Sequence, residues 1–182
     1  MTIILRDPTG EATSSFRSRV PPLKSFQGKT LALFDIGKMR GDEFIDKLET
    51  LCADFNINTH RYIKPTNTRI APKAIIQDIT ANCDAVIIAL SDCGSCTSCS
   101  THDLNALDKN GLCGVSVLTE EFQNAFDAQK SAIGFDAASV YVPHPMQNKT
   151  RAELHSFAQR YFSSILGKIC TEEIPNLHEQ AR

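Results

Sequence analysis

Three cysteines stand three residues apart, at Cys93, Cys96 and Cys99, within the stretch SDCGSCTSCSTHD. They follow directly on the apolar run DAVIIAL, which predicts a buried strand. A C-x-x-C pair is used in disulfide redox chemistry, in metal binding and in nucleophilic catalysis, so the spacing alone leaves three kinds of chemistry open. The choice among them depends on the elements that position the sulfur atoms.

A helix is expected after these cysteines, running to about residue 110. Ser100 and Asp103 fit the capping box that begins a helix, so Asp103 has a structural interpretation beside any functional one. A cysteine ahead of a helix N-terminus has a thiol pKa lowered from about 8.5 to roughly 3.5–7.5, because backbone N–H groups and the helix dipole favour the thiolate. Cys93, nearest the strand, is therefore the predicted nucleophile, and Cys96 is the predicted resolving thiol.

Metal binding is the main alternative for this segment. Cys93, Cys96, Cys99 and His102 supply four ligands of the kind that zinc or an iron–sulfur cluster takes. Structural zinc sites usually combine two separate ligand pairs, however, and four ligands at a strict spacing of three do not converge easily from one loop that enters a helix. We therefore expect no metal, with these four residues as the ligand set if one is bound.

Apolar runs alternate with helical patterns from Gly28 onward. Strands are expected at residues 30–35, 58–63, 84–90, 114–118 and 139–142, and helices at 42–55, 72–82, from the cysteine loop to 110, at 120–132 and at 150–168. This alternation predicts a single-domain, doubly wound α/β fold of the flavodoxin or Rossmann type, with a parallel five-stranded sheet in the order 2-1-3-4-5. Residues 1–27 are expected to form an irregular arm, 28–170 the catalytic α/β domain, and 171–182 a loose C-terminal tail.

In this strand order a ligand is expected beyond the carboxyl ends of the strands, where the chain changes direction between the first and third strands. The loop DIGKMRG after the first strand is expected to bring Asp35, Gly37 and Lys38 near Cys93. Further substrate contacts are predicted from the cysteine loop and from the loop after the fourth strand, at Ser95, Thr97, Thr119 and Glu120.

Two histidines are the candidates for proton transfer. His144 stands between two prolines after the last strand, on a stiff segment at the edge of the sheet where the other loops meet. His102 is either a second acid or base or an exposed residue of the first helical turn.

Length and composition narrow the class of protein. The chain has 182 residues and a formal net charge of −2, which suits one domain and offers no basic face to nucleic acid. It contains no apolar run of membrane-spanning length and begins without a secretory signal pattern, so we expect a cytoplasmic protein without a membrane partner. Seven cysteines in a reducing compartment predict thiols, ligands or catalysts rather than a structural disulfide framework. The oligomeric state is left open, with a homo-oligomer as one option.

Six segments together carry a family resemblance: RDPTGEA, GKTLALFDIGK, KPTNTRIAP, CDAVIIALSDCGSCTSCSTHD, LTEEF and VPHP. Through them the chain resembles the UGSC family of (seleno)proteins over about residues 5 to 168, in a cysteine-containing form with the motif CGSC. The resemblance implies that Cys93 occupies a position open to selenocysteine, which suits a low-pKa nucleophilic or redox thiol. The C-x-x-C-x-x-C pattern is also similar to the selenocysteine motif of glycine-reductase-type selenoproteins, which cleave a carbon–heteroatom bond reductively.

These observations favour a cysteine-dependent oxidoreductase that acts on a small-molecule substrate. Cys93 would attack the substrate, Cys96 would release it, and an external thiol would reduce the resulting disulfide without a tightly bound cofactor. Lys38 would hold an anionic group of the substrate. One alternative is a redox-neutral lyase, isomerase or hydrolase in which Cys93 adds to a carbonyl or activated alkene. Another is a metal-binding or redox-sensing module.

Overall fold

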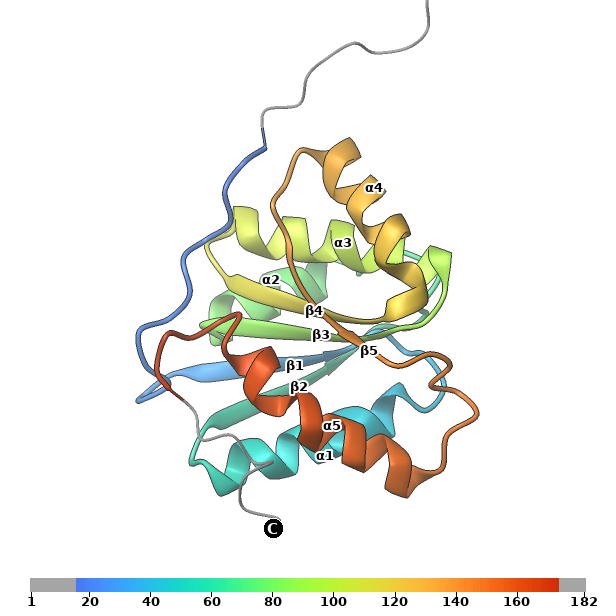
Figure 1. The fold of residues 1–182 in the computed structure, drawn as a ribbon. Helices are drawn as coiled ribbons and strands as arrows, with labels where there is room; N and C mark the ends of the chain where they lie inside the picture. Colours follow the sequence, from blue (N-terminus) through green and yellow to red (C-terminus); the bar gives the residue numbers. More distant parts are fainter. Residues whose placement is uncertain (1–15, 174–182) are drawn as a thin grey trace, which may run out of the picture.

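Five parallel strands form one sheet in the order β2-β1-β3-β4-β5, with helices on both faces (Figure 1). The computed structural model describes residues 16–173. Its strands are β1 Thr30–Asp35, β2 Asn58–Ile63, β3 Ala85–Ser91, β4 Cys113–Thr119 and β5 Ala138–Val142. Its helices are α1 Gly41–Asp54, α2 Lys73–Asn82, α3 Gly94–Lys109, α4 Gln123–Ile133 and α5 Arg151–Leu166, with a short 3-10 turn, η1, at Glu120–Phe122. The doubly wound fold and the strand order are confirmed.

The burial of the strands follows from their place in the sheet. β3 and β4 are buried at every residue because they lie inside the sheet with helices on both faces, and their sequences AVIIALS and CGVSVLT are correspondingly poor in charge. β2 lies at one edge, and each of its residues is exposed or half-buried. Central parallel strands of this kind are recognisable as short continuous apolar runs.

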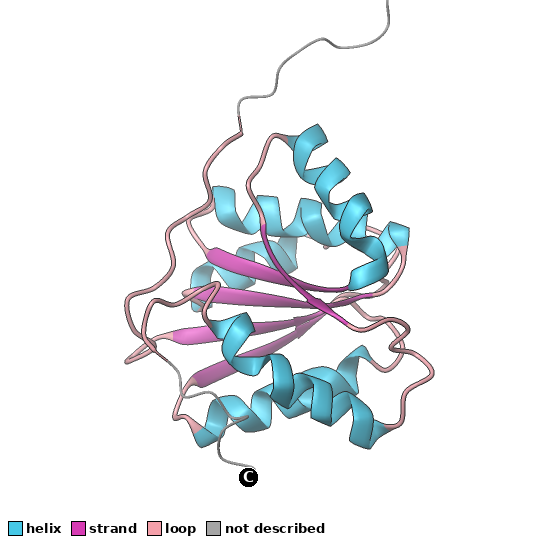
Figure 2. Cartoon of the chain, viewed as in Figure 1, coloured by secondary structure: helices cyan, strands magenta, loops and turns pink. Residues whose placement is uncertain are grey.

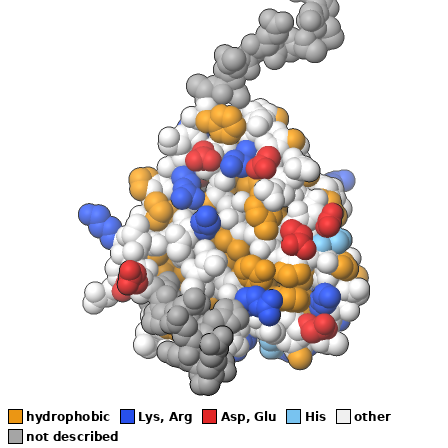
Figure 3. Space-filling model, viewed as in Figure 1, with side chains coloured by type: hydrophobic (Ala, Val, Ile, Leu, Met, Phe, Trp, Pro, Cys, Tyr) orange, Lys and Arg blue, Asp and Glu red, His pale blue; other side chains and the backbone are white. Residues whose placement is uncertain are grey.

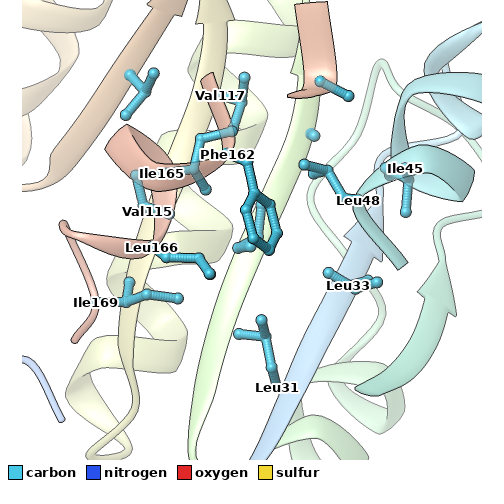
Figure 4. Close-up of a cluster of buried hydrophobic side chains, with 14 of the residues drawn as sticks. Leu31, Leu33, Ile45, Leu48, Val115, Val117, Phe162, Ile165, Leu166 and Ile169 are labelled. Atoms are coloured by element: carbon cyan, nitrogen blue, oxygen red, sulfur yellow. The ribbon is translucent and has the colours of Figure 1, made fainter. Parts of the chain in front are cut away.

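Helices α1 and α5 cover one face of the sheet, and α2, α3 and α4 cover the other (Figure 1). Between the sheet and the first pair lies an apolar core in which Phe162 of α5 sits close to leucines of β1 and α1 and to valines of β4 (Figure 4). The core on the opposite face contains Leu104 of α3, Phe126 of α4 and Cys96. One of the predicted functional sulfurs is thus part of the packing on that face.

α3 lies close to the sheet because β4 contains a glycine at the contact. A Cβ atom at Gly114 would lie 2.6 Å from a methyl group of Leu104 in α3, which is too close for a side chain. The first turn of α3 lies directly beyond the carboxyl end of β3, because only Asp92 and Cys93 separate the two elements. Figure 2 shows the loops that follow the strands gathered at that edge of the sheet.

The described part of the N-terminal arm, residues 16–27, runs past the opposite, amino-terminal edge (Figure 1). Arg17 bridges to Phe135 just before β5, and its guanidinium pairs with Asp108 at the end of α3. Leu23 bridges to Cys170, which follows α5. Residues 1–15, which include RDPTGEA, and 174–182 of the predicted tail lie outside the described residues.

The surface carries charges of both signs. Figure 3 shows Lys and Arg interspersed with Asp and Glu over one face of the molecule, in keeping with the net charge of −2. Among the helices of residues 16–173, none has the length and apolar character needed to cross a membrane.

Candidate active site

Helix α3 begins at Gly94, so Cys96 and Cys99 lie within its first two turns and the expected cysteine loop is wrong. Cys93 is the N-cap residue in extended conformation, and its sulfur accepts a hydrogen bond from the backbone N–H of Cys96 at 3.4 Å. Ser100 does not begin the helix, as one interpretation of the capping pattern had it: its hydroxyl lies 3.1 Å from that of Ser91, inside the protein. The start was missed because a sulfur caps the helix, where Ser, Thr, Asp or Asn is usual.

Cys93 and Cys96 form a disulfide across this first turn, with their Cα atoms 5.4 Å apart, well within the range for such bonds. The two sulfurs have different surroundings. Cys96 is completely buried, whereas Cys93 is half-buried at the end of the helix. Of the two residues of the disulfide, only Cys93 is therefore partly exposed to solvent.

Cys99 and His102 do not join this pair. Each step of three residues turns about 60° around a helix, so the side chains rotate from the buried face at Cys96 through half-buried Cys99 to exposed His102. Within residues 16–173, no group of three or more His, Cys, Asp or Glu side chains is arranged to hold a metal ion. The four residues of the alternative metal site are therefore not gathered as a ligand set.

Two further residues of the cysteine segment contact the disulfide turn. The hydroxyl of Ser95 is exposed and lies 3.5 Å from the sulfur of Cys93. Thr97 is completely buried, and its hydroxyl donates to the backbone carbonyl of Cys93 at 2.9 Å. Ser95 is thus positioned beside the accessible sulfur, whereas Thr97 supports the turn from within.

The loop between β2 and α2 also reaches the disulfide, a contact that the sequence reasoning missed. The side-chain amide of Asn67 donates a hydrogen bond to the sulfur of Cys96 at 3.2 Å. Asn67 lies in KPTNTRIAP, to which the sequence assigns no role beyond its part in the family resemblance. The presence of that segment among the resembling motifs is the one signal that pointed to a role.

A buried ion pair holds this loop against α3. Lys64 and Asp103 have side chains only 1% and 2% exposed, and the ammonium donates to the carboxylate at 2.7 Å. The ammonium also donates to the carbonyl of Arg69, and the second carboxylate oxygen accepts from the N–H of Ala71 at 2.7 Å. Asp103 therefore does not begin the helix, as one interpretation of the capping pattern had it, but ties the loop to its middle.

The loop after β1 lies beside the same region. The N–H of Gly37 donates to the Asp35 carboxylate at 2.7 Å, and burial raises the pKa of that carboxyl above its usual value. Gly37 has a φ of 75°, and a Cβ atom there would lie 2.7 Å from the carbonyl oxygen of Lys64. Glycine at this position therefore allows the loops after β1 and β2 to pack against each other.

Lys38 pairs with a residue that had not been singled out. Its ammonium lies 3.2 Å from the carboxylate of Asp92, which is buried and directly precedes Cys93. Asp35, Lys38 and Ile63 help to line a depression of about 390 Å³ at the carboxyl ends of β1 and β2. The positive charge of Lys38 thus lies between this depression and the disulfide turn, and it is paired with the negative charge of Asp92.

The loops after β4 and β5 meet at His144. Its Nδ1 lies 3.0 Å from the hydroxyl of Thr119, and the ring of Phe122 packs edge-on against it at 5.7 Å between centroids. In the sheet, Leu118 of β4 pairs with Ser91 of β3, and Thr119 follows Leu118. Thr119 therefore lies next to the first turn of α3, which carries the disulfide. Glu120 is exposed at the start of η1.

The other cysteines are free thiols. Burial raises the pKa of Cys52 to about 12 and also raises the pKa values of Cys83 and Cys113. Cys170 is buried as well. These residues have the environment of small core side chains rather than of reactive thiolates.

Fold and site together define a doubly wound α/β domain that carries a C-x-x-C disulfide where β3 passes into a helix. A model of the UGSC family matches residues 4–171, and the chain belongs to this family. No curated protein matches it. Among solved structures it is similar to a diflavin flavoprotein A3 from Nostoc sp., with 10% identity and a TM-score of 0.41 over 78% of this chain and 93% of the other. A likeness of that extent carries no argument about function or cofactor.

Proposed function

We propose that the protein is a thiol-dependent oxidoreductase in which Cys93 is the nucleophile and Cys96 the resolving thiol. The observation that carries this proposal is the disulfide between a half-buried and a completely buried sulfur at the N-terminus of α3. A pair that forms this bond can also be opened and closed by thiol exchange, because thiolate attack requires access to one sulfur only. A redox-neutral cysteine enzyme has no need of the second sulfur.

The cycle balances with a small disulfide as substrate. The Cys93 thiolate attacks one substrate sulfur, forms a mixed disulfide and expels the other half of the substrate as a thiolate, which takes up a proton. The Cys96 thiolate then attacks the Cys93 sulfur, expels the remaining half and leaves the Cys93–Cys96 disulfide. Two equivalents of an external thiol restore both cysteines and become a disulfide themselves. Another electrophile with a thiol-exchangeable group would follow the same scheme.

Neighbouring residues have supporting roles in this proposal. Thr119 orients His144, which would donate the proton to the departing substrate thiolate. The Lys38–Asp92 pair would adjust the charge beside Cys93, and the depression next to it would receive the substrate. The two sulfurs store the two electrons of the reaction, so we assign no tightly bound cofactor. We place the protein in the cytoplasm, where thiol reductants are abundant.

Single serine substitutions of the cysteines test this function. The probe is bis(2-hydroxyethyl) disulfide, with reduced glutathione as the external thiol, and adducts are located by peptide mass spectrometry. Cys93→Ser should form no adduct and lose turnover, whereas Cys96→Ser should accumulate a mixed disulfide on Cys93. Cys99→Ser is the matched control from the same helix and should behave as the wild type.

Two outcomes would contradict the proposal. Equal, mild losses in Cys93→Ser and Cys96→Ser would indicate a packing role for both residues. Full turnover of Cys96→Ser would remove its role as the resolving thiol and would favour the redox-neutral alternative.

A further inference from the structure

The surroundings of Cys96 are unfavourable for the thiolate that the proposed cycle requires. The side chain is completely buried and packs in the apolar cluster with Leu104 and Phe126. Burial in such surroundings raises the pKa of a thiol, and a thiol of high pKa is a poor leaving group in disulfide exchange. Opening of the disulfide at Cys93 must nevertheless release Cys96 as a thiolate at this position.

One side chain offsets this cost. The amide nitrogen of Asn67 lies 3.2 Å from the Cys96 sulfur. This sulfur takes up the negative charge when the S–S bond breaks. A hydrogen bond to a charged acceptor is stronger than one to a neutral acceptor, so the contact gains strength as the sulfur becomes a thiolate. Such a donor stabilises the product of opening more than the disulfide itself.

The loop that carries Asn67 is held by contacts outside the disulfide. Asp103 follows Cys96 by seven residues, which is two helical turns, so both residues lie on the same face of α3. The loop that carries Asn67 is fixed to that face by the buried pair of Lys64 with Asp103 at 2.7 Å. The loop that carries the donor therefore has an anchor that does not involve either cysteine.

We propose that Asn67 is a catalytic residue that stabilises the Cys96 thiolate during reductive opening, and that Lys64 and Asp103 are its positioning residues. In this step an external thiolate attacks the Cys93 sulfur, a new S–S bond forms to it, and the Cys93–Cys96 bond breaks with its electron pair on Cys96. A second external thiolate then attacks the external sulfur of the mixed disulfide and releases Cys93. The inference rests on the proposed redox cycle, in which an external thiol is the reductant.

The pKa of Cys96 tests the contact without any substrate. In a Cys93→Ser background, thiolate absorbance is titrated, and the same titration of Cys93→Ser/Cys96→Ser is subtracted to remove the other thiols. Asn67→Ala should raise the Cys96 pKa by about one unit, a tenfold change in the dissociation constant. Asn67→Asp has nearly the same shape but places a carboxylate on the thiolate, so it should raise the pKa further. Thr68→Ala, an exposed neighbour in the same loop, is the control and should leave it unchanged.

The rate of opening tests the catalytic step. The Cys93–Cys96 disulfide is reduced by dithiothreitol with Asn67 intact or replaced, while circular dichroism verifies that each variant is folded. A thiol of higher pKa is expelled more slowly, so a rise of about one unit in the Cys96 pKa should slow the opening of the disulfide by about threefold in Asn67→Ala. Asn67→Asp should be slower still, and Thr68→Ala should match the wild type.

The outcomes separate this inference from the proposed function. A Cys96 pKa and an opening rate that are unchanged in both Asn67 variants overturn the role of Asn67, even if the wild type turns over the disulfide probe. Equal effects of alanine and aspartate also overturn it, since a purely structural role would not distinguish a carboxylate from a methyl group. The expected order with no turnover in the wild type supports the contact and refutes the proposed function.

Discussion

Breaking the buried pair of Lys64 and Asp103 should destabilise the fold strongly. Lys64→Met keeps the length of the side chain but leaves the Asp103 carboxylate, 2% exposed, with the N–H of Ala71 as its remaining partner among the described contacts. Removing one member of a buried pair typically costs about 3–5 kcal/mol, because the other charge is left without compensation. Asp103→Asn should cost a similar amount. Either loss is a large share of a typical total stability of about 5–15 kcal/mol.

Urea unfolding followed by circular dichroism measures these losses, with the cysteines kept reduced in every sample. The double variant Lys64→Met/Asp103→Leu removes both charges and should lose much less than the two single losses added together. Lys29→Met is the matched control, since it breaks an ion pair with Asp84 whose side chains are 44% and 34% exposed. Its cost should stay below about 1 kcal/mol.

This reasoning would be refuted by single losses below about 1 kcal/mol, or by a double variant that loses the full sum. Either result would mean that the loop after β2 is held by other contacts. The proposed position of Asn67 would then lack its anchor.

Three further predictions concern the charges and thiols around the site. Lys38→Met should raise the pKa of the Cys93 thiol, because the substitution leaves the Asp92 carboxylate unpaired next to that thiol, and Asp92→Asn should lower the same pKa. Shifts of both variants in the same direction would exclude the ion pair as a modulator of Cys93. In the reduced protein at about pH 6.5, iodoacetamide should modify Cys93 before Cys52, because burial raises the pKa of Cys52 to about 12. Peptide mapping that finds the reverse order would contradict the assignment of Cys93 as the nucleophile. Burial raises the pKa of Asp35 above 3.8, so its contribution to stability is present below that pH and is lost as pH rises through the higher folded value. In urea unfolding, Asp35→Asn should therefore become more stable relative to the wild type as pH rises above 3.8, and a constant difference would show that this carboxyl does not titrate as described.

Much of the fold was predictable because its central strands are short apolar runs. The bounds predicted for β1 and β2 match the structure to the residue. Those of β3 and β4 differ by one residue at each end, and those of β5 by one residue at its start. Strand order followed from the alternation of strands and helices with right-handed crossovers. Local patterns were sufficient for β3 and β4 because these strands are buried at every residue and their sequences are correspondingly apolar.

The site was predictable only where its chemistry is local. The pairing of Cys93 with Cys96 agrees with the spacing, and both lie in one helical turn. The start of α3 was missed because a cysteine caps it, and the ion pair of Lys64 with Asp103 joins residues 39 positions apart. Contacts of that kind depend on how a loop folds onto a helix, which periodicity does not encode.

The reduction potential of the Cys93–Cys96 pair tests the central claim most directly. The protein is equilibrated in glutathione redox buffers, the free thiols are alkylated, and the oxidised fraction of each cysteine is measured by peptide mass spectrometry. A catalytic pair should open and close reversibly with a midpoint between about −270 and −120 mV, the range of C-x-x-C oxidoreductases. A midpoint below about −300 mV is typical of structural disulfides and would contradict the account, as would a reversible disulfide formed by any other pair of cysteines.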